Sequence, residues 1–446
     1  MNRVGGQARR AGKLDADRIA GPREAPGRER GQAGRSSRSR ILETLLITPK
    51  TGTVFVLTFL ANLGYGVMIP SLALHAHSTG ATNSSIGMIV SAFAAAQLLT
   101  QIPVGRLSDR IGRRFLIAAG FLGVAVAAAL YNFATGTGHF LLLQGFAGIS
   151  IGLVWPPLMA LLTDDVGPSE RGKLMGIFNT IFFIGVGVGP LMGGFIAAQY
   201  GHMAAFSVWA VISAVAAVFC LVTLKDPPKT KTETARRGGH APMVGGGLLK
   251  PGFAPTFAAA CAVRARGGFC TSFNNALLPI YAVGLFSATP QMIGSLMFTH
   301  GLMLAFFNLP GGLMTDRVGR RWPAVLGSLV ATVGVLWYAA PTGFWSLVVA
   351  VGLAGAGSAF ATPAIAALTA DVCNPERRGE AFGYFLTSFL IGMVLGALVF
   401  GFVSDLVGLW GAVLAWGMTS LGLSLAGIIM RETKTPTPVD ARVARA

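Results

Sequence analysis

Twelve long apolar segments set the strongest limit on how this chain can fold. They run roughly over residues 52–78, 85–104, 113–133, 138–163, 172–199, 203–224, 255–284, 291–313, 322–340, 344–370, 379–404 and 408–430. Each is close to the length of about 20 residues that an α-helix needs to cross the hydrocarbon core of a bilayer. The segments therefore predict an all-α membrane protein with twelve transmembrane helices.

The amino-acid composition agrees with a membrane location. Hydrophobic residues make up 53% of the 446 residues and charged residues only 12%, whereas soluble domains carry about a quarter charged residues. The 60 glycines favour close helix packing in lipid, where small residues line the contacts. A net charge of +17 would indicate nucleic-acid binding in a soluble protein, but here the charge follows the turns between apolar segments. We therefore expect the lipid bilayer, and no nucleic acid, as a partner.

The basic residues predict the orientation of the chain. The gaps after odd-numbered apolar segments hold no Lys or Arg. The gaps after even-numbered segments hold many, among them Arg113, Arg171, Arg237, Arg320 and Arg378. Because cytoplasmic loops carry the excess of Lys and Arg, we expect a multi-pass protein of the plasma (inner) membrane with both termini in the cytoplasm.

The apolar and polar stretches divide the chain into five parts. Twelve of the 35 Lys and Arg residues lie in residues 1–50, which we expect to be a disordered, basic cytoplasmic tail; attachment to anionic lipid is the alternative. Residues 51–224 and 251–430 are predicted to form an N-terminal and a C-terminal six-helix half. The stretch 225–250 is typical of a flexible cytoplasmic linker, and residues 431–446 are predicted to be a cytoplasmic tail.

The two halves repeat each other in sequence. PVGRLSDRIGRR at 103–114 matches PGGLMTDRVGRR at 310–321, and Asp316 follows Asp109 by 207 positions. The same offset pairs Pro156 with Pro363, Asp164 with Asp371, and Gly176 with Gly383. Two pseudo-symmetric halves related by an axis along the membrane normal are a transporter architecture.

The repeated motif identifies a family. It reads Gly105-Arg-Leu-Ser-Asp109-Arg-Ile-Gly112-Arg113-Arg114 in the first half and recurs from Gly312 to Arg321. Its glycines permit a tight turn and a close backbone approach, Asp109 can cap a helix N-terminus, and Arg113 can hold a carboxylate bidentately. After residue 50 the chain resembles the major facilitator superfamily over nearly its whole length, and within it the twelve-span drug:proton antiporters.

The resemblance implies a cytoplasmic gate that is latched shut in the outward-open state. Asp109 would meet the start of the eleventh segment, and Arg113 would meet Asp109 and Asp164. By the repeat, Asp316, Arg320 and Asp371 would do the same at the fifth segment. The full gate set is Gly105, Asp109, Gly112, Arg113, Arg114, Asp164, Gly312, Asp316, Gly319, Arg320, Arg321 and Asp371. The alternative is that these arginines only set the topology.

A second motif lies on the fifth segment. It consists of Gly176, Gly185, Gly189, Pro190, Gly193 and Gly194. Three of these glycines recur every four residues and so form one smooth stripe for close helix contact, while Pro190 bends the helix. The spacing is similar to a motif associated with export-type antiporters of the family; the alternative is a generic packing seam. The eleventh segment keeps only part of it, with Ala397 in place of the proline.

The pattern departs from the family where protons are concerned. Family members often carry an arginine early in the fourth segment, implicated in proton coupling, but Leu141 stands there. No Asp or Glu lies near the middle of any predicted span. His300 is then the best remaining titratable group for coupling; a neutral, hydrogen-bonded histidine is the alternative.

Two arginines lie within the seventh segment. Charge at the centre of a membrane helix costs about 2.5–3.5 kcal/mol on insertion scales, so such groups face a cavity or snorkel to the surface. Snorkelling is the simpler interpretation for Arg264 and Arg266. The other is that a cavity-facing arginine, with Arg266 the deeper one, attracts an anion or modulates the gate.

Polar and aromatic residues within the spans are candidates to line a substrate cavity. They are Asn62, Tyr65, Gln97, Gln101, Trp155, Asn179, Arg266, Asn274, Asn275, His300, Asn308 and Thr362. A cavity with so little charge favours lipophilic or amphipathic solutes over small ions. Each residue could equally be a hydrogen-bonding contact between helices.

Together these features predict a secondary active transporter that works by alternating access. We expect it to export a lipophilic or amphipathic small molecule in exchange for protons, as a multidrug-efflux antiporter does, and to be a monomer. The alternatives are an importer or uniporter of a small organic solute on the same fold, and a non-transporting membrane sensor. No phosphate-binding loop, metal-ligand spacing or nucleophile–base pattern is present in the sequence, so we expect no enzyme activity, cofactor or metal.

Overall fold

The chain folds into long helices. The computed structural model describes residues 48–163, 171–224 and 247–433, without the side chains of residues 102, 106, 109, 110, 171–173 and 376. The first half contains α2 (Pro49–Ser78), α3 (Asn83–Ile111), α4 (Arg113–Leu130), α5 (Thr137–Thr163), α6 (Arg171–Tyr200) and α7 (His202–Thr223). The second half contains α9 (Ala254–Ala276), α10 (Leu278–Phe286), α11 (Pro290–Val318), α12 (Arg321–Trp337), α13 (Phe344–Val372) and α14 (Arg378–Ala426). These helices belong to one compact unit.

Twelve crossings can be traced in the described ranges. Nine helices are long and apolar enough to cross a membrane, and the pair α9 and α10 adds a tenth as one span bent by 50°. The 49 residues of α14 include a non-helical Gly408, so its two arms make two crossings. The 17-residue apolar helix α12 supplies the last. The predicted all-α fold with twelve spans is therefore confirmed, with the seventh span broken near Leu277.

Local sequence signals set several helix ends. Thr48, Thr82 and Thr289 each accept a hydrogen bond from the backbone N–H three residues on, as N-caps do. Gly112 and Gly319, with φ of 111° and 110°, separate α3 from α4 and α11 from α12. A side chain there would be strained, which is why the repeated motif needs a glycine at this place.

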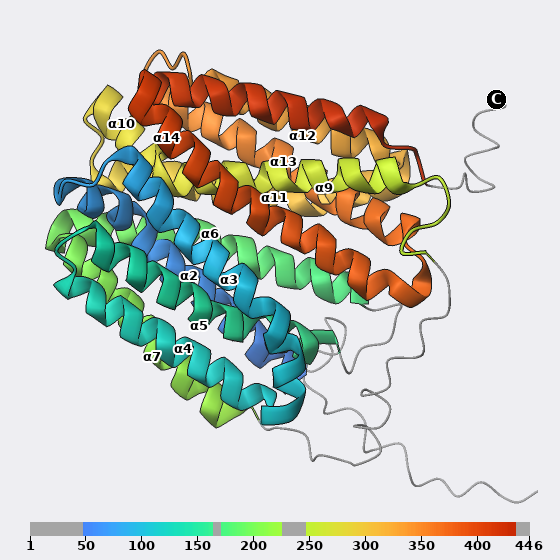
Figure 1. The fold of residues 1–446 in the computed structure, drawn as a ribbon, viewed down its shortest axis with the longest axis horizontal. Coiled ribbons are helices and arrows are strands. Elements are labelled where there is room, and N and C mark those ends of the chain that lie inside the picture. Colours follow the sequence, from blue (N-terminus) through green and yellow to red (C-terminus); the bar gives the residue numbers. More distant parts are fainter. Residues whose placement is uncertain (1–47, 164–170, 225–246, 434–446) are drawn as a thin grey trace, which may run out of the picture. The chain divides into compact units, whose positions relative to one another are not determined.

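Figure 1 shows the blue-to-green helices of the first half gathered on one side and the yellow-to-red helices of the second half on the other. The halves meet chiefly along two pairs of helices, α3 with α14 and α6 with α11. We call these contacts the α3–α14 seam and the α6–α11 seam.

The two seams are built from equivalent positions. A Cβ atom at Gly87 would lie 2.2 Å from the Ala397 carbonyl oxygen, and one at Gly294 would lie 2.5 Å from the Pro190 carbonyl oxygen. Gly294 follows Gly87 by 207 positions, and Ala397 follows Pro190 by the same number. The repeat seen in the sequence is thus a repeat of contacts, and close backbone approach is what its small residues provide.

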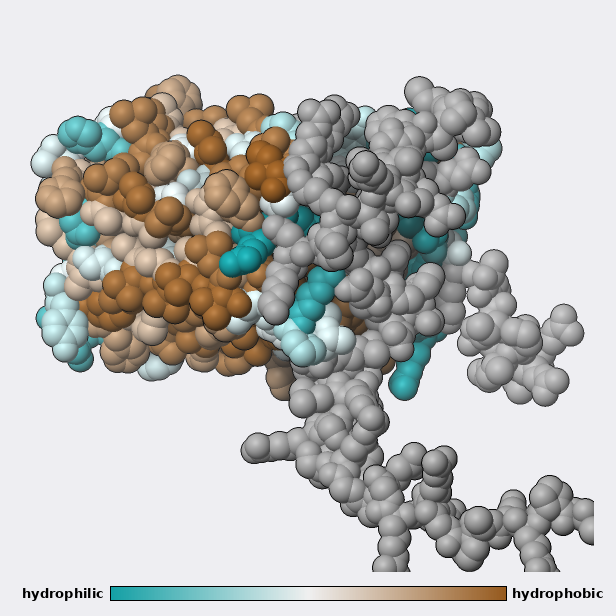
Figure 2. Space-filling view, turned by 90° about the horizontal axis from the view of Figure 1, so that it is seen from below, coloured by the Kyte–Doolittle hydropathy of each residue, from teal (hydrophilic) through white to brown (hydrophobic). Residues whose placement is uncertain are grey.

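The outer faces of the helices are apolar. Leu142, Val222 and Trp345 expose 72%, 74% and 77% of their surface. Figure 2 shows hydrophobic residues covering much of one face of the bundle. Exposed apolar side chains on this scale are what a bilayer accepts and water does not.

Candidate functional site

The basic turns of the two halves lie at one end of the bundle, which we call the basic end. Arg114 donates a hydrogen bond from Nη2 to the Leu221 carbonyl, and Arg321 donates one from Nη2 to the Ile428 carbonyl over 2.9 Å. Both partners in the second bond follow those in the first by 207 positions. Each half therefore ties the start of its third helix to the end of its sixth in the same way.

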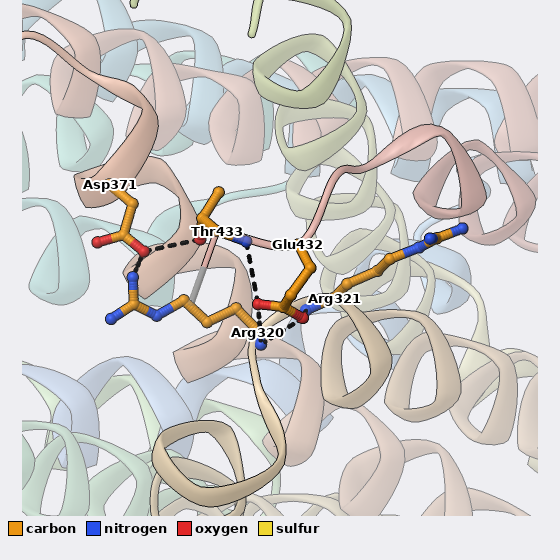
Figure 3. A network of polar contacts seen from close by, with 5 residues as sticks. All are labelled: Arg320, Arg321, Asp371, Glu432 and Thr433. Carbon is orange, nitrogen blue, oxygen red and sulfur yellow. Dashed lines mark hydrogen bonds and ion pairs between the residues drawn. The ribbon is translucent and has the colours of Figure 1, made fainter. Parts of the chain in front are cut away.

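A network of five residues joins three chain segments at this end (Figure 3). The Glu432 carboxylate accepts hydrogen bonds from the backbone N–H groups of Arg320 and Arg321, over 2.9–3.0 Å. Asp371, at the end of α13, forms an ion pair with the Arg320 guanidinium and accepts a 2.7 Å hydrogen bond from the Thr433 hydroxyl. A negative charge at the start of α12 also meets the positive end of the helix dipole.

Sequence reasoning missed Glu432 and Thr433. The repeat offset of 207 pairs Glu432 with Lys225 and Thr433 with Asp226. The acidic residue that follows the last helix of each half was the signal that could have pointed to them. Residues 225 and 226 lie outside the described part of the chain.

The expected gate contacts are seen only in part. The structure brings Arg320 and Asp371 together, whereas Asp164 and the side chain of Asp109 lie outside the described residues. Arg113 is buried, at 8% exposed. Asp316 is exposed at the end of α11, and its expected contact with the fifth span is not seen among the described side chains.

Four glycines near the basic end lie in open space among the described atoms. A Cβ atom built at Gly105, Gly176, Gly312 or Gly383 would meet no described atom within 4 Å. The close backbone approach expected at Gly105 is therefore not seen among the described atoms. The glycines that bring backbones close together across the two seams, such as Gly87, Gly194 and Gly294, lie away from this end.

The opposite end is closed across both seams. The Asp405 carboxylate of α14 accepts hydrogen bonds from the backbone N–H groups of Asn83 and Ser84 at the start of α3, over 3.1 and 2.9 Å. A Cβ atom at Gly194 would lie 2.4 Å from the Pro290 carbonyl oxygen in the other seam. The role of Asp405 as a cap across the two halves was not foreseen from the sequence.

The stripe of Gly185, Gly189 and Gly193 packs on α2. Cβ atoms at Gly189 and Gly193 would lie 2.7 Å from the Leu63 carbonyl oxygen and 2.1 Å from that of Val67. Gly66 of α2 in turn leaves room for the Pro190 ring, since a Cβ there would lie 2.7 Å from Pro190 Cδ. The motif thus holds α6 against α2 on one face, while Gly187 and Gly194 face α11.

Arg266 is the charged group buried deepest among the candidates. It lies halfway along α9, is 2% exposed, and donates a 3.1 Å hydrogen bond from Nη2 to Ser358 Oγ of α13. His300 of α11 packs on the same part of α13: its Nδ1 is 3.4 Å from the Val351 carbonyl oxygen and would be 3.2 Å from a Cβ atom at Gly355, one turn before Ser358. The structure therefore brings Arg266 and His300 together around α13.

Arg264 has a different environment from Arg266. Its guanidinium carbon lies 4.6 Å from the ring centre of Phe389 and 5.5 Å from that of Phe385, both on α14. These are cation–π distances. The two arginines, only two residues apart, therefore serve two separate contacts.

The other cavity candidates divide into three groups. Asn275 and Tyr65 meet across the halves, with Asn275 Nδ2 donating to the Tyr65 hydroxyl over 3.4 Å. Asn62 and Thr362 bond to carbonyls of their own helices, and Trp155 packs against Phe182 with ring centres 5.6 Å apart. Gln97, Asn274 and Asn308 are buried, and Gln101 and Asn179 are half-buried.

Comparisons with known proteins agree with this arrangement. The chain is 28% identical over 360 residues to an uncharacterized MFS-type transporter of Methanocaldococcus jannaschii, covering 80% of this chain and 91% of that protein. It is 25% identical to the quinolone resistance protein NorA of Staphylococcus aureus, covering 84% and 95%.

Solved structures share the fold. A bacterial homologue of the human lysosomal transporter Spinster, in an inward-facing and occupied conformation, matches with a TM-score of 0.68 at 16% identity, over 88% of this chain and 96% of that one. The nucleoside transporter NupG matches with a TM-score of 0.65 at 16% identity, over 86% and 100%. The sequence model of one family matches residues 54–285 and 265–445, and this chain therefore belongs to the Major Facilitator Superfamily of transporters.

Proposed function

We propose that this transporter exports lipophilic or amphipathic small molecules across the plasma membrane in exchange for protons. The observation that carries the proposal is the glycine and proline motif of α6, packed on α2 with backbone contacts that leave no room for a Cβ atom. The similarity of the whole chain to NorA, a quinolone resistance protein, supports outward transport of a drug-like solute.

The difference between the two ends supports alternating access. If the basic end faces the cytoplasm, as the positive-inside rule predicts, the tight seams close the outer side and the open glycines lie inside. This is the arrangement in which an exporter loads its substrate. The gate set, with Asp109 and Asp164 among its members, would then close the cytoplasmic side in the alternate state.

Proton exchange has a specific candidate group. Among the described residues, carboxylates lie near helix ends, as Asp371 and Asp405 do, so a mid-span carboxylate is not available there. His300 lies near the middle of the span formed by α11 and packs on α13, which also carries the partner of Arg266. The lack of a described mid-span carboxylate favours a uniporter as the second candidate function.

Transport in inverted membrane vesicles tests the proposal. The dyes ethidium, Nile red and carboxyfluorescein sample positive, neutral and negative charge. If the protein is a proton-coupled exporter, inverted vesicles will take up at least one of the dyes only when the vesicle lumen is acidic. Dye uptake that does not depend on the pH gradient would indicate a uniporter. Dye uptake only in right-side-out vesicles would indicate an importer. Dye binding without flux in either kind of vesicle would indicate a sensor.

The gate is tested in the same vesicles with Asp109→Asn. If this residue helps to close the cytoplasmic side, the variant will insert normally and transport more slowly. Wild-type flux at equal expression would exclude Asp109 from the gate, without deciding the direction of transport.

A further inference from the structure

Arg266 is a buried charge with most of its hydrogen-bonding capacity unused. It is 2% exposed, and its Nε and Nη1 atoms find no acceptor among the described residues. Among the described residues the guanidinium donates to Ser358 Oγ at 3.1 Å, which is a neutral hydroxyl. An uncompensated charge at this depth is costly in a membrane protein. A bound anion would offset that cost.

The other half shows that the fold does not need this charge. Gly185 approaches the Phe59 carbonyl, and its equivalent Gly392 approaches the Ala265 carbonyl. Ala265 follows Phe59 by 206 positions, so Arg266 corresponds to Leu60.

Its two neighbours differ between the halves in the same way. Gly148 approaches the Phe93 carbonyl and Gly355 that of His300, so His300 corresponds to Phe93, and Ser358 by the offset of 207 corresponds to Ile151. Three polar groups in one half thus replace three apolar residues in the other. The first half packs well with Leu60, Phe93 and Ile151 at these positions, so packing does not require the three polar groups of the second half.

Arg266 also begins a polar stripe along α9. Cys270 and Asn274 follow at intervals of four residues, are 3% and 5% exposed, and so share its face of the helix. Asn274 Oδ1 is a second buried polar atom without a partner among the described residues. The stripe ends where the span breaks and bends by 50°, between Ala276 and Leu278. Substrate sites of secondary transporters lie near the middle of the membrane, and Arg266, halfway along α9, lies at that depth.

We propose that Arg266, with Ser358 and His300 beside it, binds the acidic head of an amphipathic organic anion, a carboxylate or a sulfonate. The inference rests on the proposed function, since it names a class among the amphipathic solutes that the protein would carry. The head would accept hydrogen bonds from Nε and Nη1 of Arg266. Because the site is closed in this conformation, the ligand would enter as the halves move.

Binding of two matched probes tests the site. Full-length protein in phosphatidylcholine nanodiscs is titrated with naphthalene-2-sulfonate and with neutral naphthalene-2-sulfonamide. We expect the sulfonate to bind about tenfold or more tightly than the sulfonamide, the effect of a charge-assisted hydrogen bond. Arg266→Leu, which installs the residue of the other half, should abolish this preference and leave sulfonamide binding within about threefold.

Two further variants keep the test decisive. Arg266→Lys retains the charge and should keep part of the preference, even if Arg266→Leu folds poorly. Arg264→Leu removes the arginine that stacks on Phe389 and should keep the full preference. The site would be overturned if the wild-type protein showed no preference for the sulfonate, or if Arg266→Leu and Arg264→Leu lost that preference equally. It would also be overturned if sodium chloride raised the melting temperature as much as the sulfonate does.

The outcomes separate this site from the proposed export. If vesicles show proton-driven export while Arg266→Leu keeps the sulfonate preference, the site is wrong and the function stands. If the preference depends on Arg266 but no export is found, the site stands and the function is wrong.

Discussion

Glu432 caps a helix to which it does not belong. Its carboxylate accepts the backbone N–H groups of Arg320 and Arg321 at the start of α12, where unpaired donors and the helix dipole favour a negative charge. The neighbouring Thr433 bonds to Asp371, which pairs with Arg320. The last described residues of the chain therefore hold the start of α12 against the end of α13.

Replacing Glu432 by Gln should lower the stability of this end. The variant removes the charge but keeps the size, so we expect a loss of roughly 0.5–1 kcal/mol, the value of an exposed helix cap. Thermal unfolding of the purified protein measures it. Glu380→Gln is the control, because the exposed Glu380 pairs, among the described residues, with Arg377 three residues away and such surface pairs contribute little. Equal shifts in the two variants would contradict the capping role.

Helix α6 contains glycines that serve different purposes. Gly189 lies against α2, where a Cβ would be 2.7 Å from the Leu63 carbonyl oxygen and 2.8 Å from Gly66 Cα. Gly176, between three and four turns earlier in the same helix, faces open space among the described residues. One helix therefore combines a rigid contact within its half and a free end at the gate.

Substitutions on α6 should separate these two roles. Gly189→Leu forces the α2 backbone away, and overpacking of this kind costs about 1–3 kcal/mol. We expect a clearly lower melting temperature and loss of transport. Gly176→Ala should melt like the wild type, because its methyl group meets nothing described. An unchanged melting temperature for Gly189→Leu would show that the two helices are not held together here.

In the described residues, the close backbone contacts across the two seams lie away from the basic end. Asp405 is the polar group that fastens the closed end, since it caps α3 from α14. Ser91 lies deeper in the same seam, 3% exposed and bonded to the Val394 carbonyl. Opening of this end should therefore expose Ser91.

Asp405→Ala should shift the protein toward the conformation that is open at this end. Losing the cap costs the closed state roughly 1 kcal/mol, about a fivefold change in population. In a background without its four cysteines, Ser91→Cys should then react faster with an impermeant maleimide added outside cells. Thr135→Cys, exposed at the same end, controls for labelling itself. An unchanged labelling rate of the cysteine at position 91 would show that Asp405 does not hold this end closed.

The sequence predicted the helices and the repeat because both depend on local pattern. Spans follow from runs of apolar residues, and the matched motifs gave the offset that the seams obey. The caps by Glu432 and Asp405 were missed because each joins residues far apart in the chain, and no periodicity records such a pair. The pairing of Arg266 with Ser358 was missed for the same reason, although Arg266 itself was singled out as a charge within a span.

The matched seams have a bearing on how such a chain arises. Position 87 of one half meets position 397, and position 294 meets position 190, which is the reciprocal rule of an interface between two identical subunits. A protein of half this length, paired with its own copy about a twofold axis, would make both contacts at once. Fusion of two such copies then leaves each free to diverge, as Leu60 and Arg266 have done, while the surface that joins them stays the same.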